Sequence, residues 1–242
     1  MADVADEDKA RLIAARLAAV RQRMDAAAAR AGRDPRAITL VAVSKTQPAD
    51  SVRAAAAAGQ MVFGENRLEE ALPKMQGLAQ VAGLEWHMIG HLQSRKARQA
   101  AGAGFGLIHS VDTLKLAERL GQAAHENGRR QPVLLELNVS GEASKAGFRA
   151  GPGEDWTALT RLAQVPGLEV RGLMTMAPMS PDPSLARPYF ERLRQVLDEL
   201  GQQMSFGPAP VLSMGMSDDF EVAIEAGATM VRVGRAIFGE RD

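Results

Sequence analysis

One of the six lysines in this chain stands where an amine could take part in covalent chemistry. Lys45 ends the apolar run Ile-Thr-Leu-Val-Ala-Val-Ser-Lys at residues 38–45, which predicts a buried strand. Burial at a strand end disfavours the charged form of an amine, and the neutral form can attack a carbonyl carbon. The alternative is a strand-end lysine whose long side chain reaches solvent. The run by itself does not separate these two interpretations.

Two small glycine-containing loops in the last third of the chain indicate a phosphate site. Ser213-Met-Gly215-Met-Ser217 leads into a predicted helix, and Gly234 with Arg235 follows a predicted strand. Backbone N–H groups and a hydroxyl in such loops can hold a phosphate. A tight turn with a capping serine is the alternative for the first loop. A lysine on the first strand and an arginine on the last strand favour the phosphate interpretation.

A metal site is less well supported. His87 and His91 have the spacing of zinc ligands on a helix, but Gly90 and the strand-like context do not suit that geometry. Met88 stands where a His-Glu-x-x-His motif has its glutamate. We therefore predict no metal site here. Asn66, which follows another predicted strand, could bond a ligand or simply form a turn.

Strand-like and helical segments alternate from residue 38 onward. The predicted strands are 38–45, 61–65, 84–89, 105–111, 132–139, 169–176, 210–214 and 229–233. The helical stretches between them are 50–58, 67–79, 93–101, 113–127, 154–165, 185–203 and 217–226. Such alternation argues for a parallel sheet, and eight units fit a closed (β/α)8 TIM barrel. An open doubly wound sheet is the structural alternative.

The chain is predicted to be a single α/β domain over residues 1–242. An extra helix over 6–31 precedes a barrel over 38–242. Active sites of such barrels lie at the C-terminal ends of the strands, which is where the polar residues above fall. On the first strand, Val41 and Val43 share a face with Lys45, so both valines should fill the barrel beneath the amine.

Composition limits the function classes. The 29 acidic and 29 basic residues balance, so nothing draws the whole chain to nucleic acid or to an anionic membrane. The absence of cysteine excludes disulfides, thiol nucleophiles and thiolate metal sites. No apolar stretch approaches the roughly 20 residues that span a bilayer. The acidic N-terminus lacks the pattern of a secretion signal, so we expect a cytoplasmic protein.

Together these segments resemble the pyridoxal phosphate homeostasis proteins, a family of barrels similar to the N-terminal domain of alanine racemase. The matching motifs include Leu-Val-Ala-Val-Ser-Lys45-Thr, Phe-Gly-Glu-Asn66, Trp86-His-Met-Ile-Gly-His, Ser144-Lys-Ala-Gly, Leu-Ser213-Met-Gly-Met-Ser-Asp-Asp and Val-Arg232-Val-Gly234. The resemblance implies a barrel of pyridoxal 5′-phosphate (PLP) fold type III that lacks the C-terminal β domain of the racemases. It also implies a PLP site formed by Lys45, Asn66, Ser213, Gly215, Arg232, Gly234 and Arg235.

The resemblance also implies a role for each residue. Lys45 would carry PLP as an internal aldimine, Ser213 and Gly234 would bind its phosphate, and Asn66 would line the pocket. Arg232 would face the pyridine nitrogen. Since an arginine cannot accept the pyridinium proton, the ring would remain a weak electron sink. Such a site would hold PLP well and drive carbanion chemistry poorly.

Two residues depart from the family pattern. Arg235 stands where threonine or serine is usual after the glycine of the last strand. Its guanidinium could pair with the phosphate or turn outward and leave that contact to the backbone. Arg67 stands where a tyrosine is common, at the expected edge of the pocket.

We expect a non-catalytic carrier that buffers PLP or delivers it to apo PLP-dependent enzymes in vitamin B6 homeostasis, and we expect it to be a monomer. The alternative is a PLP-dependent amino-acid racemase. Related racemases supply a second base as a tyrosine from an added β domain, whereas the one tyrosine here, Tyr189, falls on a predicted helix. A third possibility is a barrel enzyme that uses a Schiff-base lysine on a phosphate-bearing substrate.

Overall fold

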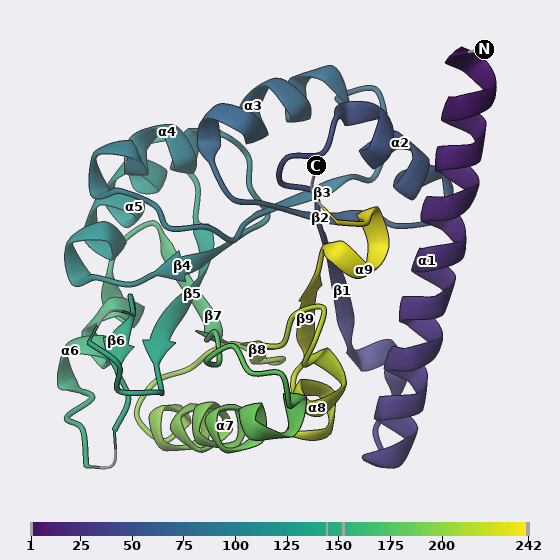
Figure 1. Ribbon diagram of the computed structural model, residues 1–242. Helices are drawn as coiled ribbons and strands as arrows, with labels where there is room; N and C mark the ends of the chain where they lie inside the picture. The colour runs from purple at the N-terminus through teal and green to yellow at the C-terminus, as the bar shows by residue number, and fades with distance from the viewer. Residues whose placement is uncertain (1, 144, 152, 241–242) are drawn as a thin grey trace.

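Eight parallel strands close into a barrel in the computed structural model, which describes residues 2–143, 145–151 and 153–240 (Figure 1). These strands are β1 (Thr39–Val43), β2 (Val62–Glu65), β3 (Glu85–Met88), β4 (Leu107–Val111), β5 (Gln131–Asn138), β7 (Leu168–Met174), β8 (Val211–Ser213) and β9 (Met230–Val233). Their order is β4-β3-β2-β1-β9-β8-β7-β5, and β4 also pairs with β5. The predicted (β/α)8 barrel is therefore confirmed, and the open doubly wound sheet is excluded. A two-residue strand, β6 (Phe148–Arg149), extends the sheet beside β5.

Helices surround the strands as an outer layer (Figure 1). They are α2 (Ala49–Ala57), α3 (Leu68–Gly77), α4 (Ala97–Gly102), α5 (Leu114–Glu126), α6 (Thr157–Thr160), α7 (Arg187–Gly201), α8 (Phe220–Glu225) and α9 (Arg235–Phe238). Short 3-10 turns are η1 (Pro35–Ala37), η2 (Ser94–Lys96), η3 (Arg161–Gln164) and η4 (Pro183–Ala186). Helix α5 is amphipathic, with Leu116 and Leu120 buried on one face and Lys115 and Glu118 exposed on the other. The Thr113 hydroxyl caps this helix by accepting from the N–H of Leu116 at 3.3 Å.

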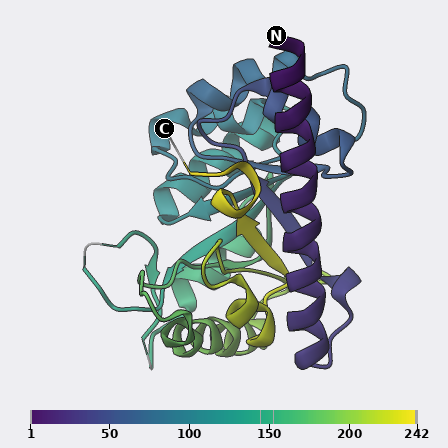
Figure 2. The same ribbon diagram turned by 45° about the vertical axis from the view of Figure 1, so that its right-hand side comes forward.

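The N-terminal helix lies along the outside of the barrel. Helix α1 (Ala2–Arg30) packs against α2, α8 and α9, as the turned view shows (Figure 2). Its buried side chains include Ile13, Leu17 and Val20, the spacing that the sequence pattern predicts. Arg23 and Arg30 form ion pairs with acidic residues of α8 at 2.8 Å. No helix in the described ranges is both long and apolar enough to cross a membrane.

The interior of the barrel has an apolar layer beneath its mouth. Its buried members come from five of the eight strands and are Val41, Leu107, Leu134, Met174 and Met230. Val43 lies on the same face of β1, two residues closer to the mouth, where it lines a cavity. Val41 therefore fills the barrel interior as predicted, whereas Val43 lines the same cavity as Lys45.

Several predicted segments differ from the structure in their bounds, and two of them show the physical reason. Strand β1 stops at Val43 because the chain then turns, with the Gln47 N–H donating to the Ser44 carbonyl at 3.0 Å. Lys45 therefore lies in the turn after the strand. The predicted helix 154–165 is divided into α6 and η3, and it begins late because the Asp155 carboxylate accepts from the Thr157 N–H at 2.9 Å.

Gly215 sets the distance between the loop after β8 and helix α8. Its φ of +89° is in the left-handed region, and a Cβ there would lie 2.5 Å from the Ala223 Cβ. Both the backbone conformation and the space require glycine. The loop Ser213–Ser217 can lie this close to α8 only because the side chain is absent.

Gly215→Ala should reduce the free energy of unfolding by about 2–4 kcal/mol, the sum of backbone strain and overlap with α8. Gly104→Ala is the matched control, because Gly104 has a φ of +86° and a Cβ there would have no neighbouring atom within 4 Å. The control should lose about 1 kcal/mol from strain alone. Urea unfolding measures both losses, and equal losses would contradict the overlap with α8.

Candidate functional site

A cavity of about 380 Å³ lies at the C-terminal ends of the barrel strands. Five of the seven residues predicted for the cofactor site line it, namely Lys45, Asn66, Arg232, Gly234 and Arg235. Its wall is completed by Val43, Ile89, Met216, Ser217, Asp218, Asp219 and, from the segment after β7, Met176, Ala177, Pro178, Met179, Ser180, Asp182, Pro183 and Ala186. Ser213 and Gly215 do not line the cavity, and their positions are described below.

Lys45 reaches the cavity from a strained turn. The turn runs from Ser44 to Gln47, and Thr46 within it has a φ of +66°. Among the described residues, Thr46 is the one non-glycine residue with a positive φ. For a β-branched residue this conformation costs on the order of 1–3 kcal/mol, so the surrounding structure must hold it.

Arg232 forms the buried wall opposite the solvent side of the cavity. Its side chain projects from β9, with Nη1 donating to the Ser213 hydroxyl at 2.7 Å and Nη2 to the Thr175 carbonyl at 3.0 Å. Burial lowers the pKa of Arg232 to about 10, and Glu136 and Asp219 oppose that shift. The guanidinium therefore remains charged at neutral pH.

Ser213 supports Arg232 and does not face the cavity. As the last residue of β8 it is completely buried, and its hydroxyl lies between Arg232 and His109. A direct contact between Ser213 and a phosphate, as the sequence predicted, does not fit this position. The serine of the same loop that lines the cavity is Ser217. Gly215 is also buried, and it serves the close approach of α8 to the loop.

A chain of hydrogen bonds continues from Arg232 through the barrel interior. Ser213 Oγ lies 2.9 Å from His109 Nδ1, and His109 Nε2 lies 3.0 Å from His87 Nδ1. His87 Nε2 lies 2.8 Å from a carboxylate oxygen of Glu85, whose side chain is 53% exposed at the start of β3. The chain thus joins the cavity to the opposite end of the barrel.

The two ends of this chain limit its direction. An arginine only donates, so the Ser213 hydroxyl oxygen accepts from Arg232, and its own proton is left for His109 Nδ1. Glu85 only accepts when ionised, so His87 donates to it from Nε2. Complete burial, and then the neighbouring His87 and Arg232, lower the pKa of His109 well below its ordinary value, which favours a neutral His109 ring.

The rim of the cavity pairs opposite charges. Arg235 is exposed on α9, and its guanidinium makes a short ion pair with Asp218. The Gly234 N–H donates to the Ser217 hydroxyl at 3.3 Å, which joins the two glycine loops. Asp219 folds back to accept from the Met216 N–H at 2.6 Å. The two loops that the sequence singled out therefore form one side of the cavity.

Asn66 is held at the cavity by a close backbone approach. A Cβ at Gly90 would lie 2.2 Å from the Asn66 carbonyl oxygen, so glycine is required there. Arg67, next in the chain, is exposed at the start of α3 and is not part of the cavity wall. Arginine in place of the tyrosine that is common at this position therefore does not change the wall of the cavity.

The two candidate metal ligands point to different places. His87 lies in the barrel interior, whereas His91 is 62% exposed and bonds Asp112 at 2.9 Å. In the described part of the chain, no group of three or more His, Cys, Asp or Glu side chains could hold a metal ion. Tyr189 lies on α7, packed against the hydrophobic core. Ser144, from one of the matching motifs, lies outside the described residues.

Similarity to known proteins covers almost the whole chain. The model of the family described as "Alanine racemase, N-terminal domain" matches residues 15–242. A pyridoxal phosphate homeostasis protein of Pseudomonas aeruginosa is 47% identical, over 95% of this chain and 96% of that protein. The protein of the same name from Aquifex aeolicus is 42% identical, over 93% and 97%. The chain belongs to the pyridoxal phosphate homeostasis protein family.

Solved structures agree with this family assignment. PipY of Synechococcus elongatus, solved with PLP bound, is 40% identical and has a TM-score of 0.81, covering 94% of this chain and all of that chain. Alanine racemase of Corynebacterium glutamicum is 20% identical with a TM-score of 0.66, and 62% of its length is covered. The second similarity shows the shared barrel fold alone.

Glu136 should make the stability of this family member depend on pH. Burial, and then repulsion from Asp112, raises its pKa from 4.5 to about 7. Folding therefore favours the protonated form: the stabilisation is complete below about pH 4.5 and is lost as the pH rises through about 7. Between acidic and mildly alkaline pH, the free energy of unfolding of the wild-type protein should fall by an amount on the order of 2–3 kcal/mol. Glu136→Gln should not show this decrease, because glutamine does not ionise.

Urea unfolding across that range of pH measures the effect. The same substitution at exposed Glu118 is the matched control and should keep the slope of the wild-type protein. A Glu136→Gln variant whose stability falls with pH as steeply as that of the wild type would contradict the assignment to Glu136.

Proposed function

We propose that this protein binds PLP through Lys45 and acts in intracellular vitamin B6 homeostasis, buffering the cofactor or delivering it to apo PLP-dependent enzymes. The observation that carries the proposal is the position of an amine and a buried guanidinium on one cavity of about 380 Å³. That volume is within the range of small-molecule pockets. The same cavity carries small residues from two loops that can take a phosphate.

Lys45 would make the covalent link. Bound PLP supplies an aldehyde, and the Lys45 amine condenses with it to a Schiff base with release of one water. The link is reversible, since water can reverse the condensation. The apolar side chains of Val43 and Ile89 would bound the volume next to the amine.

Arg232 would face the ring nitrogen. It has no acceptor, and its own pKa of about 10 keeps it protonated at neutral pH. It therefore donates to the nitrogen and disfavours its protonation. A ring held in this way accepts electrons poorly, which suits storage better than carbanion chemistry.

The phosphate would lie against the two loops. Ser217 and the Gly234 N–H already bond each other at 3.3 Å, and both can turn to an anion between the loops. Arg235 is engaged with Asp218. A phosphate would compete with that carboxylate for the guanidinium, so Arg235 would strengthen phosphate binding less than an unpaired arginine would.

The residues around the cavity favour a carrier over a racemase. A racemase needs a second base opposite the lysine. Tyr189 is not part of the wall, and in the described part of the chain the wall contains no tyrosine or histidine. Met179, at the edge of the cavity, is 96% exposed, so the site borders on solvent. We also propose that the protein acts as a monomer.

Lys45→Ala should abolish the visible absorption band of the Schiff base and weaken PLP binding at least about tenfold. The control is Lys115→Ala, which removes an exposed lysine from α5 and should keep the band. Borohydride reduction and peptide mass spectrometry would place the adduct on Lys45. A wild-type protein that forms no adduct with PLP would contradict the proposal.

Carrier and racemase are separated by two assays on the same preparation. A carrier transfers PLP to an apo-enzyme and restores that enzyme's activity, without interconverting alanine enantiomers. Interconversion at a rate typical of enzymes, roughly 1 per second or faster, would favour the racemase.

A further inference from the structure

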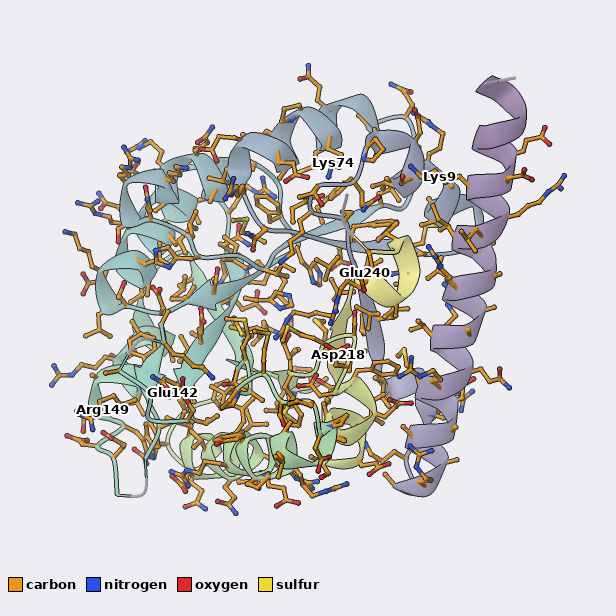
Figure 3. All side chains as sticks on the ribbon, viewed as in Figure 1. Lys9, Lys74, Glu142, Arg149, Asp218 and Glu240 are labelled. Atoms are coloured by element: carbon orange, nitrogen blue, oxygen red, sulfur yellow. The ribbon has the colours of Figure 1, made fainter. Side chains whose placement is uncertain are left out.

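A second lysine is almost completely enclosed behind the turn that carries Lys45. Lys74 projects from α3, and its side chain is 6% exposed. Its ammonium donates to the Glu65 carboxylate at 2.6 Å, to the Ser44 carbonyl at 2.8 Å and to the Glu70 carboxylate at 3.0 Å. Three donors thus meet three acceptors. Figure 3 labels Lys74 below α3, on the barrel side of this helix.

Burying these charges contributes little net free energy to the stability of the helix. Removing an ammonium and a carboxylate from water costs several kcal/mol per ion, and apolar side chains of similar volume often do as well or better. Burial raises the pKa of Glu65, although Lys74 and the Ser44 hydroxyl oppose the shift. Its second carboxylate oxygen has no hydrogen-bond partner among the described residues. Stability alone therefore does not explain these charges.

The charges hold both peptide groups that flank Lys45. The preceding peptide presents the Ser44 carbonyl to Lys74, while the Ser44 hydroxyl donates to Glu65 at 2.6 Å. The following peptide presents the Thr46 N–H to Glu70, in a short hydrogen bond. Thr46 is the residue with the unfavourable positive φ. The group consisting of Glu65, Glu70 and Lys74 is called the α3 clamp below.

The clamp also acts on the neighbouring strand. Glu65 is the last residue of β2 and directly precedes Asn66, which lines the cavity. Lys74 therefore ties the ends of β1 and β2 to α3 through one ammonium. A displaced amine reacts slowly even when the cofactor is bound, because condensation depends on the distance and angle of attack.

We propose that the α3 clamp positions Lys45 for its condensation with PLP. Glu70 and Lys74 are positioning residues, since they act on the backbone of Lys45 and not on the cofactor. The inference rests on the proposed PLP link at Lys45. It predicts that the clamp affects the covalent step more than the fit of the cofactor in the cavity.

Glu70→Ala tests the clamp, because the 29% exposed side chain can be removed while the Lys74–Glu65 pair remains. Glu70→Gln keeps an acceptor for the Thr46 N–H and should restore most of the wild-type behaviour. Glu69→Ala is the matched control. It removes the same charge from the preceding position of α3, where Glu69 pairs with Lys96 at the surface.

Three measurements separate positioning from general loss of structure. Amide hydrogen exchange at Thr46, without cofactor, should be about tenfold faster in Glu70→Ala. The rate at which the Schiff-base band forms with PLP should fall about ten- to a hundredfold. The affinity for pyridoxine 5′-phosphate, which has no aldehyde, should be unchanged. Glu70→Gln and Glu69→Ala should resemble the wild type in all three.

The neutral double variant Lys74→Met with Glu65→Gln provides a second test without an unpaired buried charge. It should remain folded by circular dichroism and show the same slow condensation with unchanged pyridoxine 5′-phosphate affinity. Condensation at the wild-type rate in Glu70→Ala, or a parallel loss of pyridoxine 5′-phosphate affinity, would overturn the inference. A wild-type protein that forms no band at all would instead overturn the proposed function, and this inference with it.

Discussion

The pairing of β1 with β9 is the constraint on which the site depends. It closes the barrel between residues almost 200 positions apart in the chain, with Val41 opposite Arg232 in the register. Because all strands are parallel, their C-terminal ends meet at one mouth. Lys45 and Gly234 therefore border the same cavity, although no local sequence signal links the two segments. Function depends here on long-range backbone pairing before it depends on any side chain.

Closure also creates an interior that can carry polar groups only if they are all bonded. Arg232 is buried, and its charge is tolerated because Ser213 and the Thr175 carbonyl accept from it. The bonds continue through His109 and His87 to a partly exposed carboxylate. Arg232 is consequently held in one orientation, which a long flexible side chain would not keep by itself.

Sequence reasoning succeeded where a residue's role follows from its position on an element. Strand ends placed Lys45, Asn66 and Arg232 at the mouth, and helical spacing identified the buried face of α1. Sequence reasoning placed Ser213 at the phosphate, whereas Ser217 is the serine of this loop that lines the cavity, because side chains alternate across a strand and the register of β8 is set by its neighbours. Ser213 points into the barrel, and Ser217 lies beyond the strand end.

Groups that depend on contacts between distant elements were not predictable. Lys74 has the sequence context of an ordinary helix lysine, and only the packing of α3 on the ends of β1 and β2 shows that it is enclosed. The bond between His87 and His109 likewise exists only after neighbouring strands have paired. The signal that could have found Lys74 is the spacing of Glu70 and Lys74, four residues apart on one helix face. That spacing is common on exposed helices, so it does not identify a buried pair.

The polar groups around the cavity have hydrogen-bond or ion-pair partners within the protein. Arg232 has two protein acceptors, and Arg235 is paired with Asp218. The Gly234 N–H and the Ser217 hydroxyl satisfy each other. Departure of a bound phosphate would therefore leave few polar groups without partners, and the penalty for buried unpaired groups would be small. The proposed carrier function needs reversible occupancy of this kind, whereas an enzyme that must retain its cofactor gains from groups that only the cofactor satisfies.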